Sequence, residues 1–142
     1  MSRIYFSLHE ANELVQKIRP RVERVIQLRD ELDLLDNTKI EFDIESVENL
    51  LLEVELNKNF HEKNVELYTL LGELIRDGCI IHDLNEMEID FYSKLEDKDI
   101  AFCWHPNDEK VLFWHYPLEK AASRRSIKEI EKKYLEKLNN LR

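Results

Sequence analysis

Glycine, proline and cysteine are all scarce in this sequence of 142 residues, which contains two, three and two of them, respectively. So few chain-breaking residues, together with 36% charged residues, are typical of long solvated helices. The cysteines, Cys79 and Cys103, are too few for a disulfide framework and form no CxxC pair, which excludes a zinc knuckle. We therefore expect both cysteines to be reduced, in a cytoplasmic protein.

Long apolar runs are missing as well. No run approaches the ~20 residues that a membrane-spanning helix needs. The first residues lack the apolar core of a signal peptide. The chain is long enough to bury a core without disulfides or metals. We expect a single domain over residues 1–142, with no membrane as a partner.

Positive charge is in short supply over most of the chain, since the net charge is -9. An acidic surface repels phosphate, so nucleic acid is not an expected partner. The exception is the stretch from Lys120 to Arg142, which has eight Lys and Arg against three Glu. Such a segment favours pairing with acidic helices, within a molecule or between subunits, over an anion-binding arm.

Common catalytic motifs are also absent. The sequence has no glycine-rich phosphate loop, no HExxH, no GxSxG and no paired-carboxylate motif on a recognisable frame. The residues therefore identify no reaction, and a non-enzymatic protein is favoured.

What is present begins with a long amphipathic helix. Ser7 and Glu10 have the spacing of a capping box, in which each side chain bonds the other residue's backbone N–H. The apolar residues that follow have heptad-like spacing and predict one helix from Leu8 to about Leu35. Pro20 lies inside it and predicts a kink.

A second helix is predicted from about Ile44 to Arg76, ending at Gly78, which can take the left-handed conformation of a helix cap. The two helices have similar lengths and a short loop, which favours an antiparallel hairpin over residues 7–77. The positions of the second helix expected to be buried are Val47, Leu51, Val54, Tyr68, Leu71 and Ile75.

Short strands follow, and then a last helix. Four runs with strand-like composition are separated by turns and predict a small antiparallel meander over residues 79–117. The runs are Cys79–His82, Glu88–Phe91, Asp99–Trp104 and Val111–Tyr116. A C-terminal helix is expected within 120–142, starting near Ser123. This order predicts an α+β fold.

Cys103, His105 and His115 lie close together in the sequence and raise the question of a metal site. If the loop between their strands is 106–109, Trp104 faces Val111, and alternation puts His115 on the Trp104 face, away from Cys103. A bulge would shift this register by one residue. The simplest pairing therefore predicts that the three side chains do not converge.

Asp90 is an acid inside an apolar strand. It either faces water or is buried and paired, with Arg124 or Arg125 as the expected cation. His115, at a strand end, is either a structural histidine or a ligand.

The chain resembles a prokaryotic domain-of-unknown-function family, number 2203. The segment FSLHEANELVQKIRPRVERVIQLRDEL resembles the family's first helix, and CIIHDLNEMEIDF resembles its next signature through Asp83 and Asp90. Cys103-Trp104 and Trp114-His115 match its Cys-Trp and Trp-His pairs, and Arg124 matches the arginine that follows. The resemblance implies the fold and a set of residues, but no activity.

The sequence also departs from the family pattern. Met87 and Asn107-Asp108 stand where the family has a glycine and a Gly-Glu turn. Residues 121–123 replace a Gly-Phe-x-Gly segment, and His105 stands where the family more often has arginine, which removes His105 from the candidates.

Two functions remain open. The favoured one is a structural or interaction protein that self-associates through its long helices, most simply as a dimer. The alternative is a small-ligand or metal-binding protein with a site around Asp90, His115 and Arg124. The ligand-binding candidates are Asp83, Asp90, Trp104, Trp114, His115 and Arg124. The metal candidates are Asp90, Cys103 and His115, with zinc as the expected ion.

Overall fold

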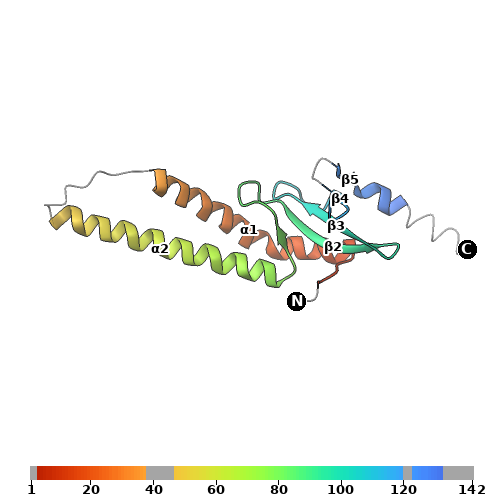
Figure 1. Cartoon of the computed structure of the whole chain (residues 1–142), viewed down its shortest axis with the longest axis horizontal. Helices are drawn as coiled ribbons and strands as arrows, with labels where there is room; N and C mark the ends of the chain where they lie inside the picture. Colours follow the sequence, from red (N-terminus) through yellow and green to blue (C-terminus); the bar gives the residue numbers. More distant parts are fainter. Residues whose placement is uncertain (1–2, 38–46, 120–122, 133–142) are drawn as a thin grey trace, which may run out of the picture.

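The computed structural model describes residues 3–37, 47–119 and 123–132, and it has the expected α+β architecture. Helix α1 (Leu8–Asn37) and helix α2 (Val47–Arg76) run antiparallel as a long hairpin, and an antiparallel sheet lies against the first half of α1 (Figure 1). The sheet comprises β1 (Ile80–Ile81), β2 (Ile89–Leu95), β3 (Lys98–Trp104), β4 (Phe113–His115) and β5 (Arg125–Ser126). None of the described helices is long and apolar enough to cross a bilayer.

Helix α1 forms as its sequence predicts. The amide of Glu10 donates to Ser7 Oγ at 3.1 Å, and the amide of Ser7 donates to Glu10 Oε1 at 3.0 Å, which confirms the capping box. The helix continues through Pro20. Its heptad-spaced apolar residues are buried: Ala11, Val15, Ile18, Val22, Val25, Leu28 and Leu32.

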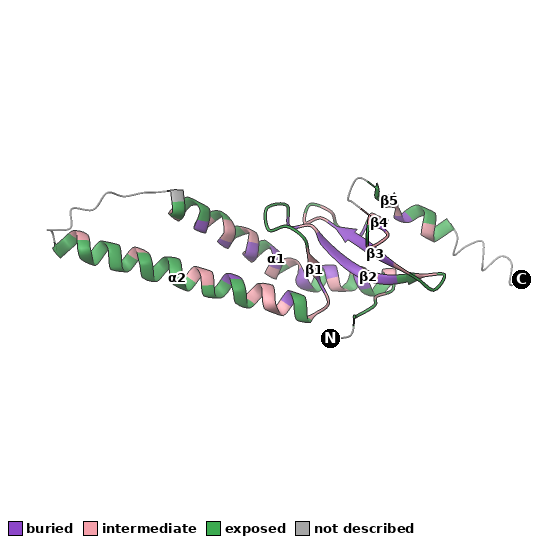
Figure 2. Cartoon of the chain, in the orientation of Figure 1, coloured by how far each residue is buried: buried purple, intermediate pink, exposed green. Residues whose placement is uncertain are grey.

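Helix α2 packs through a different face from the expected one. Its buried residues are Leu67 and Leu74, whereas five of the six expected positions are exposed and Leu71 is half-buried. The exposed residues are Val47, Leu51, Val54, Tyr68 and Ile75. The prediction was wrong because α2 has two apolar stripes at helical spacing, and periodicity alone does not show which of them meets α1. Figure 2 shows how little of α2 is buried.

The sheet has five strands rather than the predicted four, in the order β1-β2-β3-β4-β5. The missed strand is β5, which pairs with β4 through Phe113↔Ser126 and Trp114↔Arg125. Two residues are too short a run to show strand alternation in a sequence. Helical residues follow from 127 to 132, while residues 120–122 and 133–142 of the expected C-terminal helix lie outside the described part of the chain.

The register between β3 and β4 differs by one residue from the simplest pairing. Cys103 is opposite Phe113 and Ala101 is opposite His115. Val111 belongs to the connection instead of the strand, because its amide donates to Asn12 Oδ1 on α1 at 2.8 Å. A shift of one residue moves every side chain to the other face. His115 therefore lies on the Cys103 face, which corrects the predicted separation of these two residues.

The two faces of the sheet differ in chemistry. The face toward α1 carries large apolar side chains that join the helical core, among them Phe91, Phe102 and Trp104. The opposite face carries Asp90 and Cys103, which are cross-strand partners and are both buried. The buried polar residues of the molecule therefore collect on one side of the sheet.

Candidate metal centre

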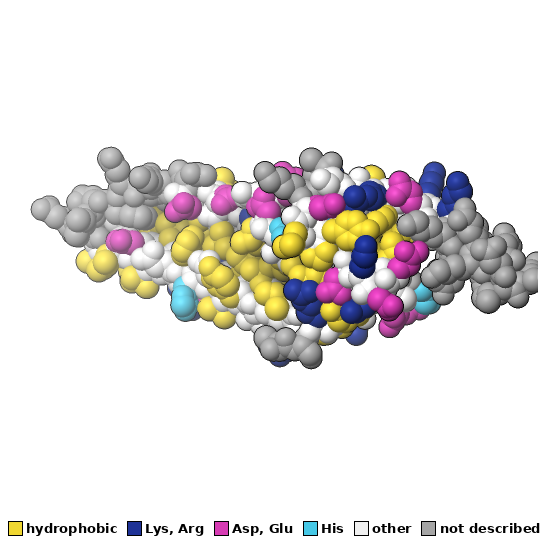
Figure 3. Space-filling model, turned by 45° about the vertical axis from the view of Figure 1, so that its right-hand side comes forward, with side chains coloured by type: hydrophobic (Ala, Val, Ile, Leu, Met, Phe, Trp, Pro, Cys, Tyr) yellow, Lys and Arg dark blue, Asp and Glu magenta, His cyan; other side chains and the backbone are white. Residues whose placement is uncertain are grey.

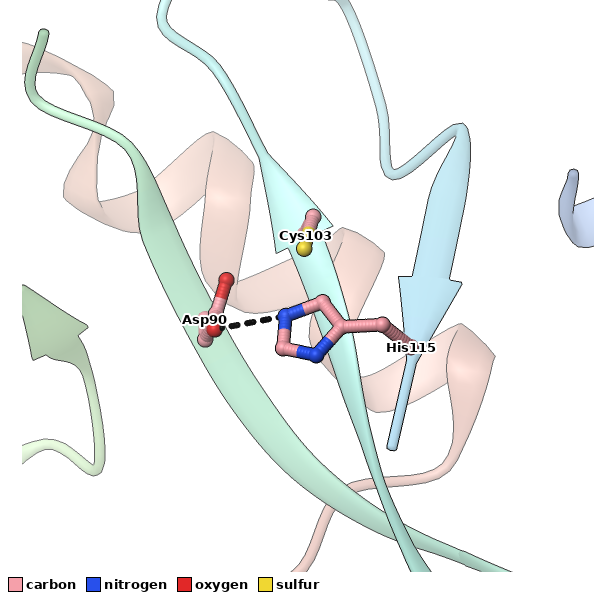
Figure 4. Close-up of side chains that lie close together, drawn as sticks. All are labelled: Asp90, Cys103 and His115. Atoms are coloured by element: carbon pink, nitrogen blue, oxygen red, sulfur yellow. Dashed lines mark hydrogen bonds and ion pairs between the residues drawn. The ribbon is translucent and has the colours of Figure 1, made fainter. Parts of the chain in front are cut away.

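Three neighbouring strands bring an oxygen, a sulfur and a nitrogen ligand together. Asp90 comes from β2, Cys103 from β3 and His115 from β4, and the three side chains point toward one another (Figure 4). One carboxylate oxygen, the thiol sulfur and one ring nitrogen all lie within 4.8 Å of one another. The residues are only 1%, 2% and 5% exposed. The sheet thus holds a compact, buried set of metal-ligating side chains.

The ring of His115 is fixed at both nitrogens. Its Nδ1 lies 2.7 Å from the backbone carbonyl oxygen of Tyr116, and its Nε2 lies 3.0 Å from Asp90 Oδ2. A carbonyl oxygen can only accept a hydrogen bond, so Nδ1 carries a proton. In a neutral ring Nε2 then has a lone pair, and it faces a carboxylate that also has only lone pairs. A proton carried by either group, or a metal ion, therefore has to lie between them.

Only one of the two carboxylate oxygens of Asp90 has a hydrogen-bond contact among the described residues. Its Oδ2 also lies 2.6 Å from Nε2 of His82, while its Oδ1 is buried and has no hydrogen-bond partner among the described residues. A buried carboxylate is costly unless its charge is paired and its oxygens are bonded. The unpartnered oxygen is therefore a second sign that the cluster accommodates a cation.

The thiol of Cys103 stays protonated unless a cation is close. Burial raises the pKa of Cys103 far above its ordinary value, and the negative charge of Asp90 raises it further. A coordinated metal ion reverses this effect, because it stabilises the thiolate directly. The same side chain can therefore be an inert thiol or a strong ligand, depending on the ion.

His82 was not among the predicted site residues, and it extends the cluster toward solvent. Its side chain is 55% exposed, yet its Nε2 reaches the buried Asp90. Ile80 on β1 pairs with Asp90, and His82 is two residues further along, on the same side as Ile80. Alternation from the predicted strand Cys79–His82 could have placed His82 beside Asp90.

Arg124 lies on the cluster's side of the sheet, at its rim. It donates to Glu88 Oε1 at 3.0 Å, and its guanidinium lies 5.1 Å from the centre of the Phe113 ring. Glu88 is two residues before Asp90 in an extended segment. Asp90 Oδ2 contacts two histidines, and Arg125, the other expected cation, pairs with Glu119 at 2.9 Å.

Asp83 does not join the cluster's hydrogen bonds but shapes the turn that leads into β2. Its Oδ1 accepts from the amide of Asn85 and its carbonyl accepts from the amide of Met87, both at 2.8 Å. Met87 has a φ of 53°, in the left-handed region. This conformation favours glycine, so a methionine is unusual at this position.

The tryptophans lie on the other face of the sheet. Trp104 is opposite Ile89 and Trp114 is opposite Phe102, so both rings point toward the α1 side. Arg19 of α1 stacks over Trp104 at 5.3 Å from the ring centre. Neither indole therefore lines the cluster.

Comparison with known proteins identifies the family. The profile of DUF2203, described as an uncharacterised conserved protein, matches residues 4–127. The chain belongs to family DUF2203. The DUF2203 match confirms the resemblance and includes His82, Asp90, Cys103 and His115. No curated protein matches the chain, and no solved structure matches it either.

Proposed function

We propose that this protein binds one divalent transition-metal ion of the zinc class through Asp90, Cys103 and His115, with His82 as the fourth ligand. The observation that carries the proposal is the convergence of three buried ligand atoms of different types within 4.8 Å. Carboxylate oxygen, thiolate sulfur and imidazole nitrogen are all common zinc ligands, and four ligands complete a tetrahedral shell.

The spacing is close to what one ion needs. With metal–nitrogen and metal–oxygen bonds of about 2.0 Å and metal–sulfur bonds of about 2.3 Å, ligand atoms of a tetrahedral site are roughly 3.3 to 3.6 Å apart. His115 Nε2 and Asp90 Oδ2 are 3.0 Å apart, and His82 Nε2 and Asp90 Oδ2 are 2.6 Å apart. The three buried ligand atoms lie within 4.8 Å of one another, and His82, whose side chain is 55% exposed, would move the furthest to complete the shell.

The hydrogen bond on the far side of the His115 ring also favours a metal. The bond from His115 Nδ1 to the carbonyl of Tyr116 fixes the ring with Nε2 directed at the cluster. Such a bond orients a histidine ligand and increases its basicity. A shell of four protein ligands leaves no position for a substrate, so we assign the ion a structural role in which it links β2, β3 and β4.

An organic ligand fits less well. The ligand atoms are too close together and too buried to enclose more than an ion. Two surface hollows lie elsewhere, one lined by α2 residues such as Leu56 and Glu62, and the other lined by Gln16, Arg19, Glu109 and Lys110. The competing account is therefore a metal-free ion pair, in which a proton alone lies between Asp90 and His115.

Metal analysis distinguishes the two accounts, and the chain has a matched control in its second buried cysteine. Untagged protein, purified without chelator, should contain close to one zinc ion per chain. The cobalt(II) form should show thiolate-to-metal charge transfer in the near ultraviolet. Cys103→Ser should lose that band, and Cys79→Ser should keep it, since Cys79 lies outside the cluster. Protein that holds no metal and does not change its thermal unfolding on addition of zinc would leave the ion pair as the explanation.

A further inference from the structure

Helix α2 carries an apolar stripe that is not used by the described fold. Its members are Val47, Leu51, Val54, Val65, Tyr68 and Ile75, each between 52% and 71% exposed. The residues that α2 buries against α1, Leu67 and Leu74, lie on another side of the helix. Figure 3 shows hydrophobic side chains gathered over the helical hairpin. Contiguous exposed apolar surface of this kind marks an interaction site.

The stripe has the spacing of a coiled-coil seam. Steps of four and three residues alternate from Val47 to Ile75. The series is completed by two polar residues in the middle, Lys58 and His61, and by Gly72 near the end. Apolar residues therefore occupy both ends of the seam, and the polar residues Lys58 and His61 lie at its centre.

We infer that a second copy of the chain docks on this stripe in antiparallel orientation, with a two-fold axis between Lys58 and His61. In an antiparallel pair the two alternating positions of the seam pack against each other. This axis places Leu51 against the second copy's Tyr68, and Val54 against its Val65. A two-fold interface uses the same patch on both subunits, so such self-complementarity is what it requires.

The residues beside the seam favour the antiparallel arrangement over the parallel one. One flank consists of Leu50, Asn57, Asn64 and Leu71, and the other consists of Glu48, Glu55, Glu62, Thr69 and Arg76. In an antiparallel pair each flank faces the same flank of the second copy. In a parallel pair it faces the opposite flank of the second copy.

Antiparallel pairing thus matches like with like on the first flank. Leu50 faces Leu71 and Asn57 faces Asn64, each time across the two copies. Parallel pairing would instead place Leu71 against Arg76. On the second flank Glu55 faces Glu62, and Lys58, one turn from each of them, offsets the negative charge.

Cysteine cross-linking tests both the partner and its orientation. The double variant Val54→Cys/Val65→Cys should form a disulfide-linked dimer under mild oxidation, while each single variant should stay largely unlinked. The two positions are about 16 Å apart along one helix, so they cannot link within a chain. The native cysteines are only 3% and 2% exposed and add little background. Efficient linking of Val54→Cys alone would mean a parallel pair and would overturn the antiparallel assignment.

Light scattering after size-exclusion chromatography tests the stripe itself. The full chain should be a dimer at micromolar concentration, and Val54→Glu should make it a monomer. Leu52→Glu is the matched control, since Leu52 is 48% exposed on the same helix but outside the seam. A monomeric full chain would overturn the proposal and leave the stripe to another occupant, either a different protein or the chain's own basic last residues.

Discussion

At the scale of single residues, the candidate metal centre combines three buried ligands with one that is half in solvent. This difference separates the effect of a substitution on metal binding from its effect on folding. Asp90, Cys103 and His115 are packed into the sheet, so replacing any of them changes the core as well as the cluster. The side chain of His82 is 55% exposed, so its replacement leaves the core intact.

His82→Ala should therefore weaken metal binding without destabilising the metal-free protein. We expect a loss of affinity of at least about 10-fold, and a change in the unfolding free energy of the apoprotein within about 0.5 kcal/mol. Competition with a chromophoric chelator measures the first quantity, and urea unfolding measures the second. His105→Ala is the control, because the ring of His105 caps its own turn by accepting from the amide of Asn107. Equal affinities for the two variants would remove His82 from the site.

Cys79 gives a prediction that is independent of the metal. Burial raises the pKa of its thiol to about 12, above the ordinary value of 9.0. Because the folded-state pKa is raised, the buried thiol supports the fold fully below about pH 9, and this contribution is lost as the pH rises toward 12, at about 1.4 kcal/mol per pH unit. Urea unfolding at pH 7, 9 and 10.5 should show a shallower alkaline loss of stability in Cys79→Ala than in the wild type. Parallel pH profiles for the two proteins would contradict this account.

At the scale of secondary-structure elements, the register of β4 positions His115 in the cluster, and α1 controls that register. Arg19 donates to the carbonyls of Pro106, Asp108 and Glu109 at 2.9 to 3.1 Å, and it stacks on Trp104. Together with the bond from Val111 to Asn12, these contacts hold the connection between β3 and β4 against the helix.

Arg19→Met should loosen this connection while leaving the helices in place. Removing three charge-assisted bonds should cost about 1 to 3 kcal/mol of unfolding free energy. Hydrogen exchange should increase at residues 105–115, and metal affinity should fall although Arg19 touches no ligand. Arg24→Met is the matched control, since Arg24 pairs with Glu66 on the exposed surface of the hairpin. Unchanged exchange at 105–115 in Arg19→Met would show that the loop keeps its register without the arginine.

The same elements show what the sequence could predict. The capping box and heptad spacing placed α1 and its buried residues correctly, because one apolar stripe on one helix leaves a single way to pack. The predicted buried face of α2 and the predicted register of β3 and β4 were wrong. In both cases the sequence allowed two arrangements that differ only in long-range contacts. For β4 the deciding contact is a side chain of α1, Asn12, 99 residues away. Asp90 and His115 were predicted as candidate ligands from the sequence. Whether their side chains meet depends on the register of β3 and β4, which the sequence did not determine.

At the scale of the whole molecule, the proposed metal centre and the proposed dimer seam are separate. The cluster lies in the sheet, which follows directly after the C-terminal end of α2, whereas the seam runs along α2 itself. An antiparallel pair of α2 helices, each about 45 Å long, places the two sheets at opposite ends of an elongated dimer. A parallel pair would place both sheets, and both metal centres, at the same end.

The two proposals should therefore fail or hold independently. Val54→Glu should be a monomer that still binds one metal ion, and Cys103→Ser should lose the ion and remain a dimer, provided that it folds. Paramagnetic distance measurement between copper(II) ions bound in the dimer should give a separation of more than about 40 Å, close to the length of the seam. A short distance would contradict the antiparallel arrangement without affecting metal binding. Loss of dimer on removal of the metal would instead show that the sheet supports the seam, because the α2 stripe alone would then be insufficient for association.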